Sequence, residues 1–265
     1  MKINLSLPGR IALFCAALVF CACASHGKAN EAQYEFWLTL PQPGSIRLIG
    51  VSGPLLKRES EINAAREEAA RKASMYSGVY VSFENTHSNG SSIFDYSARS
   101  SLVLQYDEDL EKYLERLSFD PERDVQRSGG SVYIRFAYPS VFPAFISYSF
   151  SRNADGRNAD GRNADGSPVW IHRPPGEING FPAGVGYAAR QSRVKDTFAA
   201  SRDSAAAAII SQLSTSVITG TALGYNATSI LQRSAGKLAR FLVLEIWVDP
   251  NTRAVWTLAI AQRAE

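Results

Sequence analysis

The chain has almost no cysteine, and the little it has is confined to one end. Among its 265 residues only Cys15, Cys21 and Cys23 are cysteines. Nothing after Cys23 can form an internal disulfide, a cysteine-ligated zinc site or a thiol nucleophile. These three kinds of chemistry are therefore excluded from the part of the chain that follows residue 23.

Histidine is as scarce as cysteine. The three histidines, His26, His87 and His172, show none of the spacings that metal ligands have. Each is interpreted as a solvated or hydrogen-bonded histidine rather than a ligand. The sequence also contains no phosphate-binding loop and no glycine-flanked serine with plausible catalytic partners. We therefore predict no catalytic residue, no metal site and no cofactor.

The chain also lacks a strong charge of either sign. Its formal net charge is +3, and two of its 28 basic residues, Lys2 and Arg10, lie in the N-terminal segment. Without these two, 26 basic residues stand against 25 acidic ones. A nearly neutral protein has no electrostatic footprint for nucleic acid, so we expect no nucleic-acid partner.

No apolar run is long enough to span a bilayer, but a shorter one lies near the N-terminus. Lys2 and Arg10 precede an apolar run over residues 11–20, and small residues follow it. This length and these flanking residues are typical of a secretory signal peptide. We expect residues 1–22 to be a signal peptide and the protein to be exported to the cell envelope.

Two cleavage positions fit the residues around Cys23. Ala22 and Ala24 satisfy the small-x-small rule, which would release a soluble periplasmic protein beginning at Ser25. Alternatively, "FCAC" resembles the lipobox of bacterial lipoproteins, in which a small residue precedes a cysteine that becomes lipidated. We take Cys23 as the candidate lipidation site, since several acyl chains give stable anchoring. Residues 23–34 would then be a polar tether.

A pentapeptide, RNADG, is written three times in residues 152–166. A calcium loop needs oxygen ligands at alternate positions, and Gly156 and Arg157 break that order. A stacked solenoid needs a bulky apolar residue in each unit, and this unit has none. Asp-Gly steps favour turns, and the charges of Arg and Asp cancel. We predict a flexible linker over residues 151–168.

The segments on the two sides of this linker resemble each other. Placing Gly50 on Gly186, an offset of 136 residues, aligns two alanine-rich segments without a gap. Upstream of each segment lies a tryptophan, Trp37 or Trp170, followed by a turn with proline and glycine. We interpret the two segments as copies of one module. The aligned pairs are Ile62/Phe198, Ala64/Ala200, Arg66/Arg202, Glu67/Asp203, Ala69/Ala205, Ala70/Ala206 and Val81/Val217.

Hydrophobic periodicity predicts the order β-α-β-β-α-β in the first copy. The second copy keeps β-α-β and ends in a hairpin. We predict an α+β fold of two similar small sandwich domains, residues 35–150 and 169–265, joined by the linker. The expected elements are strands at 45–51, 79–85, 97–106, 131–138 and 140–150, helices at 58–76 and from Asp107 onward, and then a helix at 193–213 with hairpin strands at 241–248 and 254–261.

Alanines define the inner face of the helix expected at 58–76, and charged residues define the other face. The pairs Glu67–Arg71 and Glu68–Lys72 have the favourable i,i+4 order, and we interpret them as a solvated surface. The carboxylates of this helix are accordingly not expected to do acid–base chemistry. The tryptophans are interpreted as core residues.

Gly184, Gly186 and Ala189 nearly match a dinucleotide-binding fingerprint. The preceding segment is turn-like instead of a long buried strand, and the nearest acid, Asp203, falls inside a helix. We therefore assign these glycines, like Gly50, to a tight turn from strand to helix.

Four features together resemble a known family. The tryptophan–proline start, the GVG turn at 184–186, the helical motif A-x-R-[DE]-x-A-A and the final aromatic hairpin are similar to the bacterial twenty-kilodalton lipoprotein family. Its relatives include the N-terminal domain of flagellar assembly protein T, which the first copy resembles in style. The resemblance implies an exported, non-enzymatic α/β envelope protein, often lipid-anchored. It carries over no catalytic residue.

The expected function is that of a non-enzymatic cell-envelope lipoprotein that acts as a binding or assembly module. Its expected partners are the membrane, through a lipid anchor at Cys23, and other envelope proteins. One alternative is an accessory protein of the flagellar basal body. Another is a secreted periplasmic protein or an envelope hydrolase with an unrecognised site.

Overall fold

The computed structural model describes the backbone of residues 36–89, 96–140, 163, 166–221 and 228–264, and their side chains except at 85–100 and 215–232. The leader, the tether with Cys23, residues 141–150 of the strand expected at 140–150, and most of the RNADG linker lie outside the described residues. The chain divides into two compact units, Met1–Leu38 and Thr39–Glu265. In the first unit, the rings of Phe36 and Trp37 meet edge to face with centroids 5.3 Å apart.

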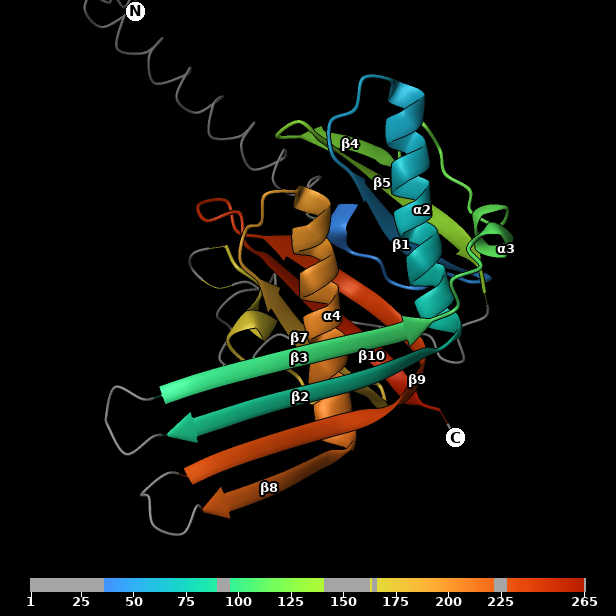
Figure 1. The fold of residues 1–265 in the computed structure, drawn as a ribbon. Coiled ribbons are helices and arrows are strands. Elements are labelled where there is room, and N and C mark those ends of the chain that lie inside the picture. The colour runs from blue at the N-terminus through green and yellow to red at the C-terminus, as the bar shows by residue number, and fades with distance from the viewer. Residues whose placement is uncertain (1–35, 90–95, 141–162, 164–165, 222–227, 265) are drawn as a thin grey trace, which may run out of the picture. The chain divides into compact units, whose positions relative to one another are not determined.

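The unit Thr39–Glu265 contains two long helices and two antiparallel sheets (Figure 1). Its described elements are, in chain order, β1 (Ser45–Ser52), α2 (Arg58–Ser77), β2 (Val79–Asn89), β3 (Tyr96–Tyr106), α3 (Glu111–Leu114), β4 (Val125–Ser128), β5 (Ser131–Pro139), a 3-10 turn η1 (Val169–Ile171), β6 (Glu177–Ile178), β7 (Phe181–Ala188), α4 (Val194–Leu213), β8 (Thr215–Thr221), β9 (Thr228–Val248) and β10 (Val255–Arg263).

The two sheets differ in size. The smaller has the order β1-β5-β4 and is built from the first half of the chain. The larger has seven strands, in the order β3-β2-β9-β10-β7-β6, with β8 also paired to β9. Strands β2 and β3 come from the first half of the chain and the other five from the second half. The two halves therefore share one sheet.

Strand β9 is 21 residues long and makes this sharing possible. Its first part pairs with β2 on one side and with β8 on the other, whereas its second part pairs with β10. Arg240 has a left-handed φ of 53°, and the register to β10 shifts between Ile260 and Gln262. These features mark a bulge at which the long strand bends and changes partners.

Helix α2 packs on the three-stranded sheet through its smallest side chains. Ala65, Ala69 and Ala73 follow one another at i,i+4 spacing and are fully buried. A Cβ on Gly50 of β1 would lie 1.9 Å from the carbonyl oxygen of Ala65. Gly50 is therefore needed for close packing of strand and helix. The expectation that it forms the turn into the helix is wrong, because it lies inside β1.

Helix α4 packs on the seven-stranded sheet in a similar way. A Cβ on Gly186 of β7 would lie 2.0 Å from the carbonyl oxygen of Ser201, and one on Gly184 would lie 2.6 Å from that of Ala205. The Ser201 hydroxyl lies 3.2 Å from the Gly186 carbonyl and 2.8 Å from the Thr257 hydroxyl. Both glycines lie within β7, so the strand-to-helix turn assigned to them is also wrong.

The predicted α+β class is confirmed, with two antiparallel sheets and three α-helices in the described residues. The predicted helices at 58–76 and 193–213 correspond closely to α2 and α4. A duplication into two domains is not confirmed. The described part of the second unit has a continuous sheet running through residues from both halves.

The helix expected from Asp107 onward is only the four-residue α3. After it, Arg116 and Leu117 donate to carbonyls three residues back, which tightens the chain into a turn. Ser118 then pairs with Ala137 of β5. A turn thus buries the apolar side chains of this segment. The short strand β4, which follows this turn, was not predicted.

Candidate functional site

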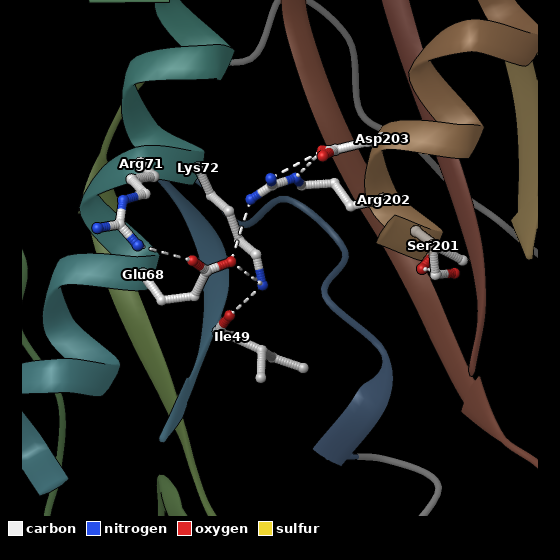
Figure 2. A network of polar contacts seen from close by, with 8 residues as sticks. Ile49, Glu68, Arg71, Lys72, Ser201, Arg202 and Asp203 are labelled. Carbon is white, nitrogen blue, oxygen red and sulfur yellow. Dashed lines mark hydrogen bonds and ion pairs between the residues drawn. The ribbon is translucent and has the colours of Figure 1, made fainter. Parts of the chain in front are cut away.

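A group of charged side chains is buried between the two long helices. Glu68 and Lys72 of α2 are 7% and 6% exposed, and Arg202 of α4 is 5% exposed. Figure 2 shows the Glu68 carboxylate pointing from α2 toward the guanidinium that α4 extends to it. We call Glu68, Lys72, Arg202 and Asp203 the interhelix cluster.

Glu68 is the centre of the interhelix cluster. Nη1 of Arg202 donates to Oε1 of Glu68 at 3.0 Å, and Nζ of Lys72 lies 3.8 Å from the same oxygen. Nη1 of the half-exposed Arg71 lies 3.5 Å from Oε2. One carboxylate thus contacts two buried cations and links α2 to α4 over 134 residues of sequence.

These positions overturn part of the expected solvated face of the first helix. Glu67 is exposed as predicted, but Glu68 and Lys72 are buried. An i,i+4 ion pair looks the same in sequence on a solvated face and beneath a second helix. Burial was decided by α4, whose Arg202 covers this part of α2. Glu61, near the start of the same helix, is also buried and pairs with Arg127 at 2.8 Å.

The pKa of the Lys72 ammonium is lowered to about 8, chiefly by burial. The Glu68 carboxylate opposes this shift, and the nearby Arg202 adds to it. Its ammonium donates to the backbone carbonyl of Ile49 in β1. The side chain therefore ties α2 to a carbonyl of the three-stranded sheet as well as to Glu68 (Figure 2).

Arg202 is held from both sides. Its Nε and Nη2 lie 2.8 and 2.7 Å from Oδ1 of Asp203, the next residue of α4, while Nη1 reaches Glu68. Burial opposes its charge, but the Glu68 and Asp203 carboxylates outweigh that effect and raise the pKa of Arg202. Arg202 stays charged, and its geometry is fixed by two carboxylates.

A small cavity of about 10 Å³ adjoins Lys72. This volume is about that of one water molecule. The cavity therefore offers no room for an organic substrate. It is lined by Thr39, Arg47, Leu48, Ile49, Lys72, Phe241, Val243 and Ile246.

Glu245 of β9 is a second acid in the core, and it is fully buried. Nε1 of Trp170 donates to its Oε2 at 2.7 Å. Trp170 is 2% exposed, so it is a core residue as predicted. Trp247 and Trp256 are only partly buried and lie opposite each other on β9 and β10.

The residues singled out from sequence for function are not brought together here. Cys23 lies outside the described residues, and His172 is exposed next to η1. The burial of the interhelix cluster was not predicted from the sequence. The sequence contains one indication of this burial. Arg202 lies in an alanine-rich stretch, where few neighbouring side chains can form an ion pair with it.

The contacts of the interhelix cluster indicate a structural task. Each of its charged groups binds another group of the protein, and the adjoining cavity is the size of a water molecule. Within the described residues, no group of three or more His, Cys, Asp or Glu side chains is placed to hold a metal ion. The described helices include none with the length and apolarity to cross a bilayer.

Comparison of the chain with known protein families, with curated proteins and with solved structures finds no match.

Proposed function

We propose that the protein is a non-enzymatic lipoprotein of the bacterial cell envelope that works as a binding or assembly module. The observation that carries this proposal is the interhelix cluster. Its buried charges are used to join α2 to α4 and to β1, as expected of a rigid scaffold. A catalytic acid or base would instead need access to a substrate.

The proposed scaffold is a duplicated strand-and-helix unit, and repeated geometry supports this. Helices α2 and α4 are both 20 residues long, and their bounds differ by the same 136 residues as the aligned sequences. Gly50 meets the Ala65 carbonyl, and Gly186 meets the Ser201 carbonyl, again at that offset. We also propose that this duplicated unit relates the chain to the twenty-kilodalton lipoprotein family.

The proposed anchor is a lipid on Cys23 in an exported chain. Supporting it are the signal-like leader and the small residue before Cys23. The anchor would hold the module at a membrane facing the periplasm, where it binds other envelope proteins.

Labelling with radioactive palmitate tests the anchor. We expect label in the wild-type chain and in Cys21→Ser, and none in Cys23→Ser. Membrane fractionation should then place the first two in the membrane pellet and the last in the soluble periplasm. An unlabelled wild-type chain recovered entirely in the soluble fraction would refute the anchor.

Crosslinking in intact cells, followed by mass spectrometry, tests the assembly role. We expect a reproducible set of envelope proteins captured by the wild-type chain. Glu68→Ala, which unlinks the helices, should capture less of the same set at equal protein abundance, whereas Glu67→Ala should capture as much as wild type. Failure to capture any envelope protein would contradict the proposed role.

A further inference from the structure

Two connections of the smaller sheet lie at one end of the unit Thr39–Glu265. Strand β1 ends at Ser52, which is paired with Val132 near the start of β5. The connection 53–57 into α2 and the β4–β5 turn at 129–130 therefore leave the sheet at the same end. The ion pair between Glu61 of α2 and Arg127 of β4, at 2.8 Å, brings the start of α2 to this end of the sheet.

Two connections of the larger sheet lie together in the same manner. Val255 at the start of β10 is paired with Ala188 at the end of β7. The connection 189–193 into α4 and the β9–β10 turn at 249–254 are thus neighbours. A Cβ on Gly129 would lie 2.8 Å from Nη2 of Arg253, which places the turns of the two sheets side by side.

We define the loop end as residues 53–61, 127–130, 187–196 and 247–256. Its most exposed apolar residues are Leu55 and Leu56, which are 49% and 106% exposed. The backbone N–H of Leu55 is bound by Glu61, which is itself paired with Arg127 of β4. The two leucines are therefore presented to solvent by a connection that is tied to both α2 and the sheet.

The loop end that carries these leucines also has an excess of basic side chains. The loop end contains seven basic residues, all exposed, and four acidic residues, of which only Glu59 is exposed. Two of the basic residues, Arg127 and Arg193, are paired with acids of the loop end. This gives the loop end a net charge of about +3 in a chain that is otherwise close to neutral. The basic residues are Lys57, Arg58, Arg127, Arg190, Arg193, Lys195 and Arg253, and the acidic ones are Glu59, Glu61, Asp196 and Asp249.

Partly exposed aromatic rings complete the loop end. Trp256 of β10 is paired across the sheet with Tyr187 on one side and Trp247 on the other. The rings of Tyr187 and Trp256 are 4.6 Å apart, and Tyr187 is 48% exposed. Tyrosine and tryptophan favour the boundary between apolar and aqueous phases, because each joins an apolar ring to a polar atom.

We infer that the loop end docks on the surface of an anionic phospholipid bilayer. Exposed leucines would enter the interface, basic side chains would meet the lipid phosphates, and the aromatic rings would lie at the headgroup level. A protein partner would also bury the leucines, but a positive charge spread over four separate segments of the chain is complementary to an extended anionic surface. This inference goes beyond the lipid anchor and does not depend on it.

Vesicle sedimentation of the exported Cys23→Ser chain tests the inference without a contribution from the anchor. We expect binding to vesicles of equal parts phosphatidylglycerol and phosphatidylcholine, and little binding to phosphatidylcholine alone. Leu55→Ser/Leu56→Ser should lower the partition coefficient about tenfold. High salt should weaken binding of the unaltered chain, since it screens the basic residues. Brominated lipids should quench tryptophan fluorescence only in the anionic vesicles.

Matched controls separate docking from folding. Val103→Ser changes an equally exposed apolar residue of β3, away from the loop end, and should bind as the parent chain does. Leu56→Ser alone changes a side chain that is fully exposed, so a weakened partition with unchanged circular dichroism supports the inference. Equal binding to both kinds of vesicle, or unchanged binding of the double leucine variant, would overturn it. If the double leucine variant kept its vesicle binding but lost a crosslink to a protein, the leucines would bind a protein, and the inference would also be overturned.

Discussion

At the scale of single residues, Glu68 is the side chain of the interhelix cluster whose removal should lower stability most. It is the counter-ion of both Arg202 and Lys72 in the interhelix cluster. Among the described residues, loss of Glu68 leaves Lys72 without a counter-ion in a poorly solvated place, and leaves Arg202 only Asp203. The penalty for such a buried charge exceeds what the ion pair itself contributes to stability. The stability of the fold is therefore sensitive to truncation of Glu68, although replacing the whole interhelix cluster by apolar residues need not change the free energy of unfolding.

We predict that Glu68→Ala lowers the free energy of unfolding by about 3–5 kcal/mol, because Arg202 and Lys72 lose their shared carboxylate. Urea unfolding followed by circular dichroism measures this difference. The matched control Glu67→Ala changes an exposed carboxylate on the same helix and should stay within about 0.5 kcal/mol of wild type. Equal effects of the two substitutions would mean that the Glu68 pairs contribute nothing.

Lys72 should make stability depend on alkaline pH. Burial lowers its pKa in the folded protein to about 8, from an ordinary value of 10.5. Between these two values the unfolded chain binds more protons at this lysine, so the contribution of Lys72 to stability rises with pH. Tyr133 and Tyr138, whose pKa values burial raises, act in the opposite direction above their ordinary value of 10.

The pH dependence of Lys72 is isolated by comparison with Lys72→Met. We predict that the stability of wild type, relative to this variant, increases from pH 8 toward pH 10. The measurement is urea unfolding across that range, in which the tyrosine contributions are common to both chains. A difference that is flat or falls with pH would show that the lysine is not desolvated in the folded protein.

At the scale of elements, each long helix approaches its sheet over a glycine. Gly50 and Gly186 face helix carbonyl oxygens so closely that no side chain fits between. Strand interiors rarely gain from glycine, which has no side chain to pack. Its presence inside β1 and β7 is explained by the short distance at which α2 and α4 cross these strands.

Adding one methyl group at Gly50 should therefore separate β1 from α2. We predict that Gly50→Ala lowers the free energy of unfolding by about 3 kcal/mol, because the neighbour is backbone and cannot rotate away. Gly53→Ala, only three residues further on, has nothing within 4 Å of the new methyl and should leave the stability close to that of wild type. Thermal melting of both variants provides the comparison, and similar melting temperatures would contradict the close approach.

At the scale of the whole molecule, the halves of the chain are joined by backbone as well as by side chains. Strand β2 pairs with β9 along its whole length, and Val79 and Val81 lie in one apolar cluster with Ile209 of α4. The core of the first half is therefore completed by the second. A cut between them would expose apolar surface and unpaired strand edges.

We predict that residues 39–265 unfold in one cooperative transition. Tryptophan fluorescence reports mostly on the second half, and far-ultraviolet circular dichroism reports on both halves, so coincident urea curves are the expected result. The Glu68→Ala variant should shift both curves together. Two separated transitions would mean that the halves are independent domains.

Much of the local structure was predictable because it depends on neighbours in sequence. Alanines at helical spacing and flanking turn residues located α2 and α4 to within one or two residues of their observed bounds. Alternating apolar residues located β1, β5 and the β9–β10 hairpin. The segment after Asp107 was mistaken for a longer helix, because its leucines fit helical spacing and a compact turn equally well.

The sequence by itself determined the class of the fold, the two long helices and the strands that flank them, since these follow from spacing along the chain. Only the tertiary structure decided which charges are buried and which strands share a sheet. From its sequence neighbours, Glu68 is predicted to be a surface residue, whereas Arg202 buries it in the structure. The residues near Val79 do not indicate that Val79 pairs across the sheet with Leu238. Both outcomes depend on contacts between residues more than 130 positions apart, which no local pattern encodes.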